Sequence, residues 1–138
     1  QTIAKKEKFE FSELQKIDEA IAISSMSIAM HMNIKAIIAL TESGSTALMM
    51  SRIRSDIPIY AFTRNEYTQR RVSLYRGVTS YPYKFIANTF SEVLSEVSKE
   101  LLQSEMVRAG DLVLITSGSP LKVEGFTNSL RIIKINNQ

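Results

Sequence analysis

The sequence predicts an α/β fold, a three-layer sandwich in which helices cover both faces of a five-stranded mixed sheet. Helical and strand patterns alternate along the chain, which is typical of a mainly parallel sheet with crossover helices. Only about ten residues without a helical period separate the last two expected strands, too few for the usual parallel crossover. The fifth strand should therefore run antiparallel at an edge. Right-handed crossovers with one reversal of winding then favour the strand order 3-2-1-4-5.

The amino-terminal half supplies the first two strands. Residues 1–16 are rich in Lys without a strong period, and we expect a linker or mobile end there and a single domain over 17–138. Residues 35–40, KAIIAL, form the first expected strand, and this continuous apolar run should be buried on both faces. A hydroxyl-rich turn follows, then a helix to about Ser55, and residues 57–62, IPIYAF, form the second strand. The helix before the first strand should bury one face, composed of Ile17, Ala20, Ile21, Ser24, Ile28 and Met32.

Two capping patterns mark the later helices. In TRNE, Thr63 should accept a hydrogen bond from the amide of Glu66, and the helix should end at Gly77 in a left-handed conformation. Thr89 and Glu92 form a second capping box, ahead of another helical apolar stripe. The three remaining strands are expected at residues 78–83, 110–118 and 129–135.

Composition excludes several kinds of site. The chain has 138 residues, enough for one domain, and its net charge of +3 is too mild to indicate nucleic-acid binding. It contains no Cys and one His, His31, so disulfides, thiolate metal sites and multi-His clusters are excluded. No apolar run approaches the roughly 20 residues that span a bilayer, and we expect a cytoplasmic protein without a membrane partner. Because the chain begins with Gln rather than Met, we expect it to be a piece of a longer protein.

Two loops should lie at the carboxyl ends of the central strands, where ligands of such sheets bind. The first, TESGST, places hydroxyls and Gly44 before a helix, where unpaired amides favour an anion. The second, residues 117–128, is shaped by two glycines and a proline and carries one cation: Gly118, Gly125, Pro120 and Lys122. Together the loops predict a pocket for a phosphorylated small molecule.

The residues alone also fit a purely structural turn. Ser and Thr are common helix caps, and one Gly often only permits the chain to turn. No Lys follows Gly44 and no G-x-G-x-x-G is present, which counts against a nucleoside triphosphatase and a dinucleotide oxidoreductase. Ser117 and Ser119 have no nearby base, so nucleophilic catalysis is not expected. Arg64 is a candidate for either an anion contact or a surface ion pair, and His31 is expected to be structural.

Several separated motifs resemble one known family. The segment AIIALTESGSTALMMSRIRSDIPIYAFTRNEYTQRRVSLYRGV, followed by GDLVLITSGSP and GFTN, resembles the carboxyl-terminal domain of pyruvate kinase over about residues 17–135. It is most similar to the bacterial type that is activated by sugar monophosphates or AMP. The resemblance implies the same five-stranded fold and a place in a tetramer.

The resemblance also implies that catalysis and regulation take place in different domains. The intact enzymes transfer phosphate from phosphoenolpyruvate to ADP in glycolysis, using Mg²⁺ and K⁺ in a preceding (β/α)₈ barrel that these residues lack. This chain would be the regulatory domain, with no catalytic or metal-binding residue of its own. The implied effector phosphate-binding residues are Thr41, Glu42, Ser43, Gly44, Ser45 and Thr46. The implied residues of the loop that folds over the effector are Ser117, Gly118, Ser119, Pro120, Lys122, Gly125 and Thr127.

Two departures narrow the implied effector. Family members that bind fructose bisphosphate often have a basic residue where this chain has Glu42, and a Trp near the pocket, whereas this chain has no Trp. A sugar monophosphate or AMP is therefore expected. The expected partners are the catalytic barrel and a second copy through the terminal strand, residues 129–135, although Lys134 could instead protect a monomer's edge. An oligomerisation module with a vestigial pocket and a free-standing phosphosugar-binding or converting enzyme remain alternatives.

Overall fold

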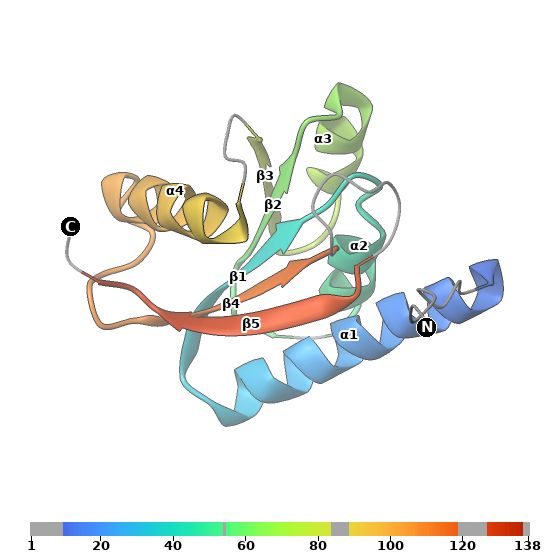
Figure 1. Ribbon diagram of the computed structural model, residues 1–138, viewed down its shortest axis with the longest axis horizontal. Coiled ribbons are helices and arrows are strands. Elements are labelled where there is room, and N and C mark those ends of the chain that lie inside the picture. Colours follow the sequence, from blue (N-terminus) through green and yellow to red (C-terminus); the bar gives the residue numbers. More distant parts are fainter. Residues whose placement is uncertain (1–9, 54, 84–88, 119–126, 137–138) are drawn as a thin grey trace, which may run out of the picture.

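The computed structural model describes residues 10–53, 55–83, 89–118 and 127–136. Within these ranges, helices and strands alternate in the expected order (Figure 1). The elements are α1 (Phe11–His31), β1 (Ile34–Leu40), α2 (Ser45–Ser51), β2 (Ile59–Thr63), α3 (Glu66–Val72), β3 (Val78–Pro82), α4 (Phe90–Gln103), β4 (Leu112–Ser117) and β5 (Ser129–Lys134).

The sheet has the strand order that the connection lengths predicted, β3-β2-β1-β4-β5. β1 pairs in parallel with both β2 and β4, and β2 pairs in parallel with β3. β5 pairs antiparallel with β4, with Leu114 opposite Ile132. The switch in winding direction therefore lies between β1 and β4, and the carboxyl ends of these two strands share one edge of the sheet.

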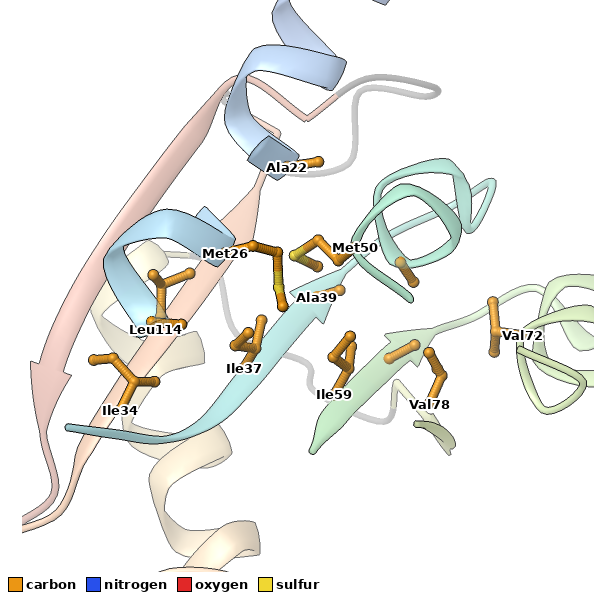
Figure 2. Close-up of a cluster of buried hydrophobic side chains, with 13 residues drawn as sticks. Ala22, Met26, Ile34, Ile37, Ala39, Met50, Ile59, Val72, Val78 and Leu114 are labelled. Carbon is orange, nitrogen blue, oxygen red and sulfur yellow. The ribbon is translucent and has the colours of Figure 1, made fainter. Parts of the chain in front are cut away.

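Helices cover both faces of the sheet, which confirms the three-layer prediction. α1, α2 and α3 pack on one face, and α4 packs on the other (Figure 1). On the first face Met26 of α1 and Met50 of α2 lie over Ile37 of β1 (Figure 2). On the second face Val97 of α4 packs with residues of β1 and β4, including Ile38. β1 is buried on both faces as expected, apart from its exposed second residue, Lys35.

α1 begins earlier than the sequence indicated. We expected residues 1–16 to be a linker, but the helix starts at Phe11. Glu10 and Glu13 form a capping box at this end, in which the amide of Glu10 donates to Glu13 Oε1 at 3.1 Å. The predicted start of the helix rested on its apolar repeat. A local cap of this kind extends the helix toward the amino terminus, beyond the first residue of that repeat.

The expected buried face of α1 is only partly correct, because Ile17, Ile21 and Ile28 are half-buried and Ile28 packs against the core. Ala20, Ser24 and Met32 are exposed. The face that packs is rotated, and its buried residues are Asp18, Ala22, Ser25, Met26 and Ala29. Apolar residues occur on more than one side of this helix, since Ile23 and Met30 remain 61% and 60% exposed. The face with small side chains packs because it allows a close approach to α2 and the sheet.

One expected cap is wrong and the other is confirmed. Thr63 does not cap α3, because it is the buried last residue of β2. Asn65 is the N-cap instead, and its Oδ1 accepts from the Thr68 amide at 3.1 Å. At α4, Thr89 accepts from the Glu92 amide at 3.2 Å, as predicted.

Two helices are shorter than expected. α2 ends at Ser51 rather than near residue 55, and the amide of Ile53 already forms a tighter turn with Met50 O at 3.1 Å. α3 ends at Val72, although Gly77 does adopt the left-handed conformation, with φ +73°. The Gly77 carbonyl accepts from an amide at the start of β2, so this glycine serves the entry into β3.

Candidate functional site

The 41–46 loop follows β1 at the carboxyl edge of the sheet and is held by its own side chains. Thr41 Oγ1 accepts from the Gly44 amide at 2.8 Å. Ser43 Oγ accepts from the Ser45 amide at 3.2 Å. Two hydroxyls therefore organise the turn before α2, and in their hydrogen bonds with described residues both act as acceptors.

Gly44 is required by both its conformation and its neighbours. Its φ is +81°, in the left-handed region that favours glycine. A Cβ at this position would lie 2.7 Å from Val72 Cγ1 and 3.3 Å from Thr68 Cγ2, both on α3. The structure places α3 side chains against Gly44.

The hydroxyls of Ser45 and Thr46 point to a buried carboxylate. Ser45 Oγ donates to Asp18 Oδ2 at 2.9 Å, and Thr46 Oγ1 donates to Asp18 Oδ1 at 2.6 Å. Asp18 also accepts from the Thr127 amide at 3.3 Å. Asp18 is 3% exposed and Thr46 1% exposed, so this cluster links α1, α2 and the approach to β5 below the surface.

Asp18 is the site residue that sequence reasoning missed. It lies in α1, and its partners follow it by 27, 28 and 109 residues. A usable signal was present, because Asp18 begins the series of small or flexible residues that the helix buries: Ala22, Ser25, Met26 and Ala29. An acid at the end of such a series indicates a buried polar contact rather than a solvated charge.

The second predicted loop, residues 117–128, contacts the segment after β1 through Thr127. Thr127 Oγ1 lies 2.7 Å from Thr46 Oγ1, so the segments after β1 and before β5 are in contact as expected. Ser117 is buried at the end of β4, where its carbonyl accepts from the Ser129 hydroxyl at 3.0 Å. Gly118 follows it and is partly exposed. The other residues predicted for this loop lie outside the described residues: Ser119, Pro120, Lys122 and Gly125.

Charged and aromatic groups adjoin the loop at the ends of β1, β2 and β3. The Arg64 guanidinium carbon lies 4.4 Å from the centre of the Tyr83 ring. Burial raises the pKa of the Tyr83 phenol, the Arg64 guanidinium opposes this rise, and the Glu42 carboxylate adds to it. Thr68 Oγ1 donates to the Glu42 carbonyl at 2.7 Å, which anchors the loop to α3. An exposed cation, Arg64, therefore lies beside the predicted phosphate loop, and the loop itself carries the acid Glu42.

Other chemistry is not visible in the described part of the chain. His31 is exposed at the end of α1, with Nδ1 2.7 Å from the Ser27 carbonyl oxygen. The described residues contain no group of three or more His, Cys, Asp or Glu arranged to hold a metal ion. Among them, no helix has the length and apolar character needed to span a membrane.

Comparisons with known proteins agree on one family. The model of the pyruvate kinase alpha/beta domain matches residues 19–133. Pyruvate kinase of Buchnera aphidicola subsp. Acyrthosiphon pisum is 44% identical over 120 residues, covering 86% of this chain and 25% of that protein. Pyruvate kinase II of Salmonella typhimurium is 41% identical over 125 residues, covering 89% of this chain and 26% of that protein.

A solved structure extends the likeness to three dimensions. The crystal structure of a pyruvate kinase from Cryptosporidium parvum superimposes with a TM-score of 0.74 at 28% identity. The match covers 86% of this chain and 23% of that one. The chain thus spans about a quarter of the length of the curated relatives it matches. With the strand order, the loop arrangement and these matches in agreement, the chain belongs to the pyruvate kinase alpha/beta domain family.

Proposed function

We propose that this chain is the allosteric carboxyl-terminal domain of a pyruvate kinase and binds a phosphorylated effector at the 41–46 loop. The contact between Thr46 and Thr127 carries the proposal, because it joins the loop after β1 to the end of the loop after β4. These loops flank the switch point, where open α/β sheets bind their ligands. An effector held between them would alter how the domain packs on its neighbours.

The structure suggests a division of roles within the loop. The described hydrogen bonds use the hydroxyl oxygens of Thr41 and Ser43 as acceptors, so both protons can be donated to phosphate oxygens. Ser45 and Thr46 direct their hydroxyls to Asp18 and would contribute main-chain amides instead. Gly44 shapes the turn, and the Glu42 carboxylate would accept a hydrogen bond from a sugar hydroxyl.

The effector class we propose is a sugar monophosphate or AMP. Glu42 stands in the loop where a second phosphate would need a cation. The exposed Arg64, stacked on Tyr83, is a described cation beside the loop, and the sole basic residue of the second loop, Lys122, lies outside the described residues. The charges around the loop therefore favour a ligand with one phosphate over a ligand with two.

The intact enzyme would transfer phosphate from phosphoenolpyruvate to ADP in the cytoplasm, with Mg²⁺ and K⁺ in its barrel. That activity is a proposal for the longer protein, since this chain spans only about a quarter of the length of the relatives it matches. The domain itself would contribute regulation and a tetramer contact rather than chemistry.

Calorimetric titration with ribose 5-phosphate tests effector binding. Ser43→Ala removes a hydroxyl that we assign to the phosphate, and it should weaken binding without unfolding the protein. Ser91→Ala is the matched control, because Ser91 is exposed on α4 on the opposite face of the sheet. Equal affinities in wild type and both variants would place the effector elsewhere.

One observation favours assembly as a second function. β5 is a terminal strand of the sheet, and within the described residues its outer edge pairs with no other strand. Leu130 and Ile132 contribute to the core on the α1 face, and Ile133 to the core on the α4 face, so the strand itself is well supported. An uncovered apolar edge favours pairing with another chain. Light scattering at tens of micromolar would measure this association.

A further inference from the structure

Asp18 is a buried carboxylate that is satisfied without a cation among the described residues. It is 3% exposed, and its three hydrogen bonds come from the hydroxyls of Ser45 and Thr46 and the amide of Thr127. No described basic side chain forms an ion pair with it. A buried charge is costly unless hydrogen bonds replace its lost hydration, so these donors are needed by the carboxylate itself.

The protons of two loop hydroxyls are therefore already used. Each hydroxyl has one proton to donate. Ser45 directs its proton to Asp18 Oδ2 at 2.9 Å. Thr46 has two acceptors within reach, Asp18 Oδ1 at 2.6 Å and Thr127 Oγ1 at 2.7 Å, and its single proton is used by one or the other of them. Toward any ligand in the loop, these two side chains present oxygen lone pairs, which repel an anion.

We propose that Asp18 is a specificity-determining residue that limits the negative charge accepted by the effector loop. This inference rests on the proposed function, namely that the 41–46 loop binds a phosphate. A phosphate at the loop would be separated from the Asp18 carboxylate by a single layer of Ser and Thr side chains. Repulsion between like charges is strong where solvent is excluded, and it grows with each charge on the ligand.

The charge of Asp18 acts in addition to that of Glu42. Glu42 is partly exposed on the loop, where water screens it, whereas Asp18 is buried beneath the loop. Asp18 therefore discriminates by charge without touching the ligand. A monophosphate is tolerated, a bisphosphate is penalised, and neutralising Asp18 increases the affinity for both.

The test compares Asp18→Asn with Glu19→Gln in the full chain. Asn has nearly the size of Asp and keeps one acceptor oxygen for Thr46, but it carries no charge. Glu19 is the next residue of α1 and is exposed, so its variant makes the same change in net charge without touching the cluster. With ribose 5-phosphate as the probe, we expect the dissociation constant of Asp18→Asn to fall about ten-fold or more, and that of Glu19→Gln to stay within two-fold.

Ser45→Ala separates charge from positioning. This variant removes one hydrogen bond to the carboxylate but leaves its charge in place, so it should not bind the probe more tightly. If Asp18 served only to position the loop, Asp18→Asn would weaken binding or leave it unchanged, and that result would overturn the inference. Asp18→Ser provides a second neutral variant if thermal unfolding shows that Asp18→Asn does not fold.

The outcomes also distinguish this inference from the proposed function. Binding by Asp18→Asn with none by wild type would support the charge limit and reject wild-type effector binding at this loop. Binding by wild type that Asp18→Asn and Asp18→Ser do not strengthen would reject the charge limit and leave the proposed function standing. No binding by wild type or by either neutral variant would reject both.

Discussion

Gly44→Ala should destabilise the domain by more than a left-handed backbone alone explains. An alanine at φ +81° incurs about 1–2 kcal/mol of conformational strain. Its Cβ would also lie 2.7 Å from Val72 Cγ1, well inside ordinary van der Waals contact. Overpacking of this kind typically costs about 1–3 kcal/mol. We therefore expect a total loss of about 2–5 kcal/mol in the free energy of unfolding.

Gly77→Ala is the matched control for the backbone component. Gly77 has a similar φ of +73°, but a Cβ there would meet nothing within 4 Å. Its replacement should cost only the strain, about 1–2 kcal/mol. Urea denaturation followed by circular dichroism measures both losses, provided that the transitions are two-state.

A double-mutant cycle tests why Gly44→Ala should lose more stability than Gly77→Ala. Val72→Ala removes the methyl group that the new Cβ would meet, so Gly44→Ala combined with Val72→Ala should lose less stability than the sum of the single changes. A loss for Gly44→Ala no larger than that for Gly77→Ala, or strict additivity in the cycle, would refute the assigned contact between α3 and the loop.

The remaining predictions concern ligand, catalysis and assembly. Ser43→Ala should weaken ribose 5-phosphate binding by about 1.5–3 kcal/mol in calorimetry, the cost of a hydrogen bond to a charged oxygen, and fructose 1,6-bisphosphate should bind wild type less tightly than the monophosphate. The 138-residue chain alone should form no ATP from phosphoenolpyruvate and ADP in a coupled assay, and measurable turnover would contradict its assignment as a regulatory domain. Wild type should scatter light as a dimer or larger at tens of micromolar, whereas Ile133→Pro, within β5, should remain monomeric with its helical circular dichroism retained; a wild-type monomer would count against pairing through β5.

Local and connection-length signals were enough to predict the topology. The continuous apolar run of β1 indicated a central strand, and the short link before β5 indicated an antiparallel edge. Both hold in the structure. These features are predictable because strand burial follows side-chain type, and because a chain of about ten residues cannot make the usual parallel crossover. The same reasoning placed the two loops at one edge of the sheet, and the contact between Thr46 and Thr127 agrees with it.

The sequence alone therefore determined the order of the elements and the place of the loops, and the tertiary structure decided which atoms meet there. α1 has apolar side chains on more than one face, so the spacing of its apolar residues did not indicate which face is buried. The buried face is the one whose small side chains allow close packing. Thr63 fits a capping pattern, but burial at the end of β2 takes precedence over that role. Asp18 and Val72 meet the loop from elements 27 or more residues away. Contacts of this kind depend on how helices pack against a sheet, and a local pattern that indicates a buried residue does not specify which residue of another element it will contact.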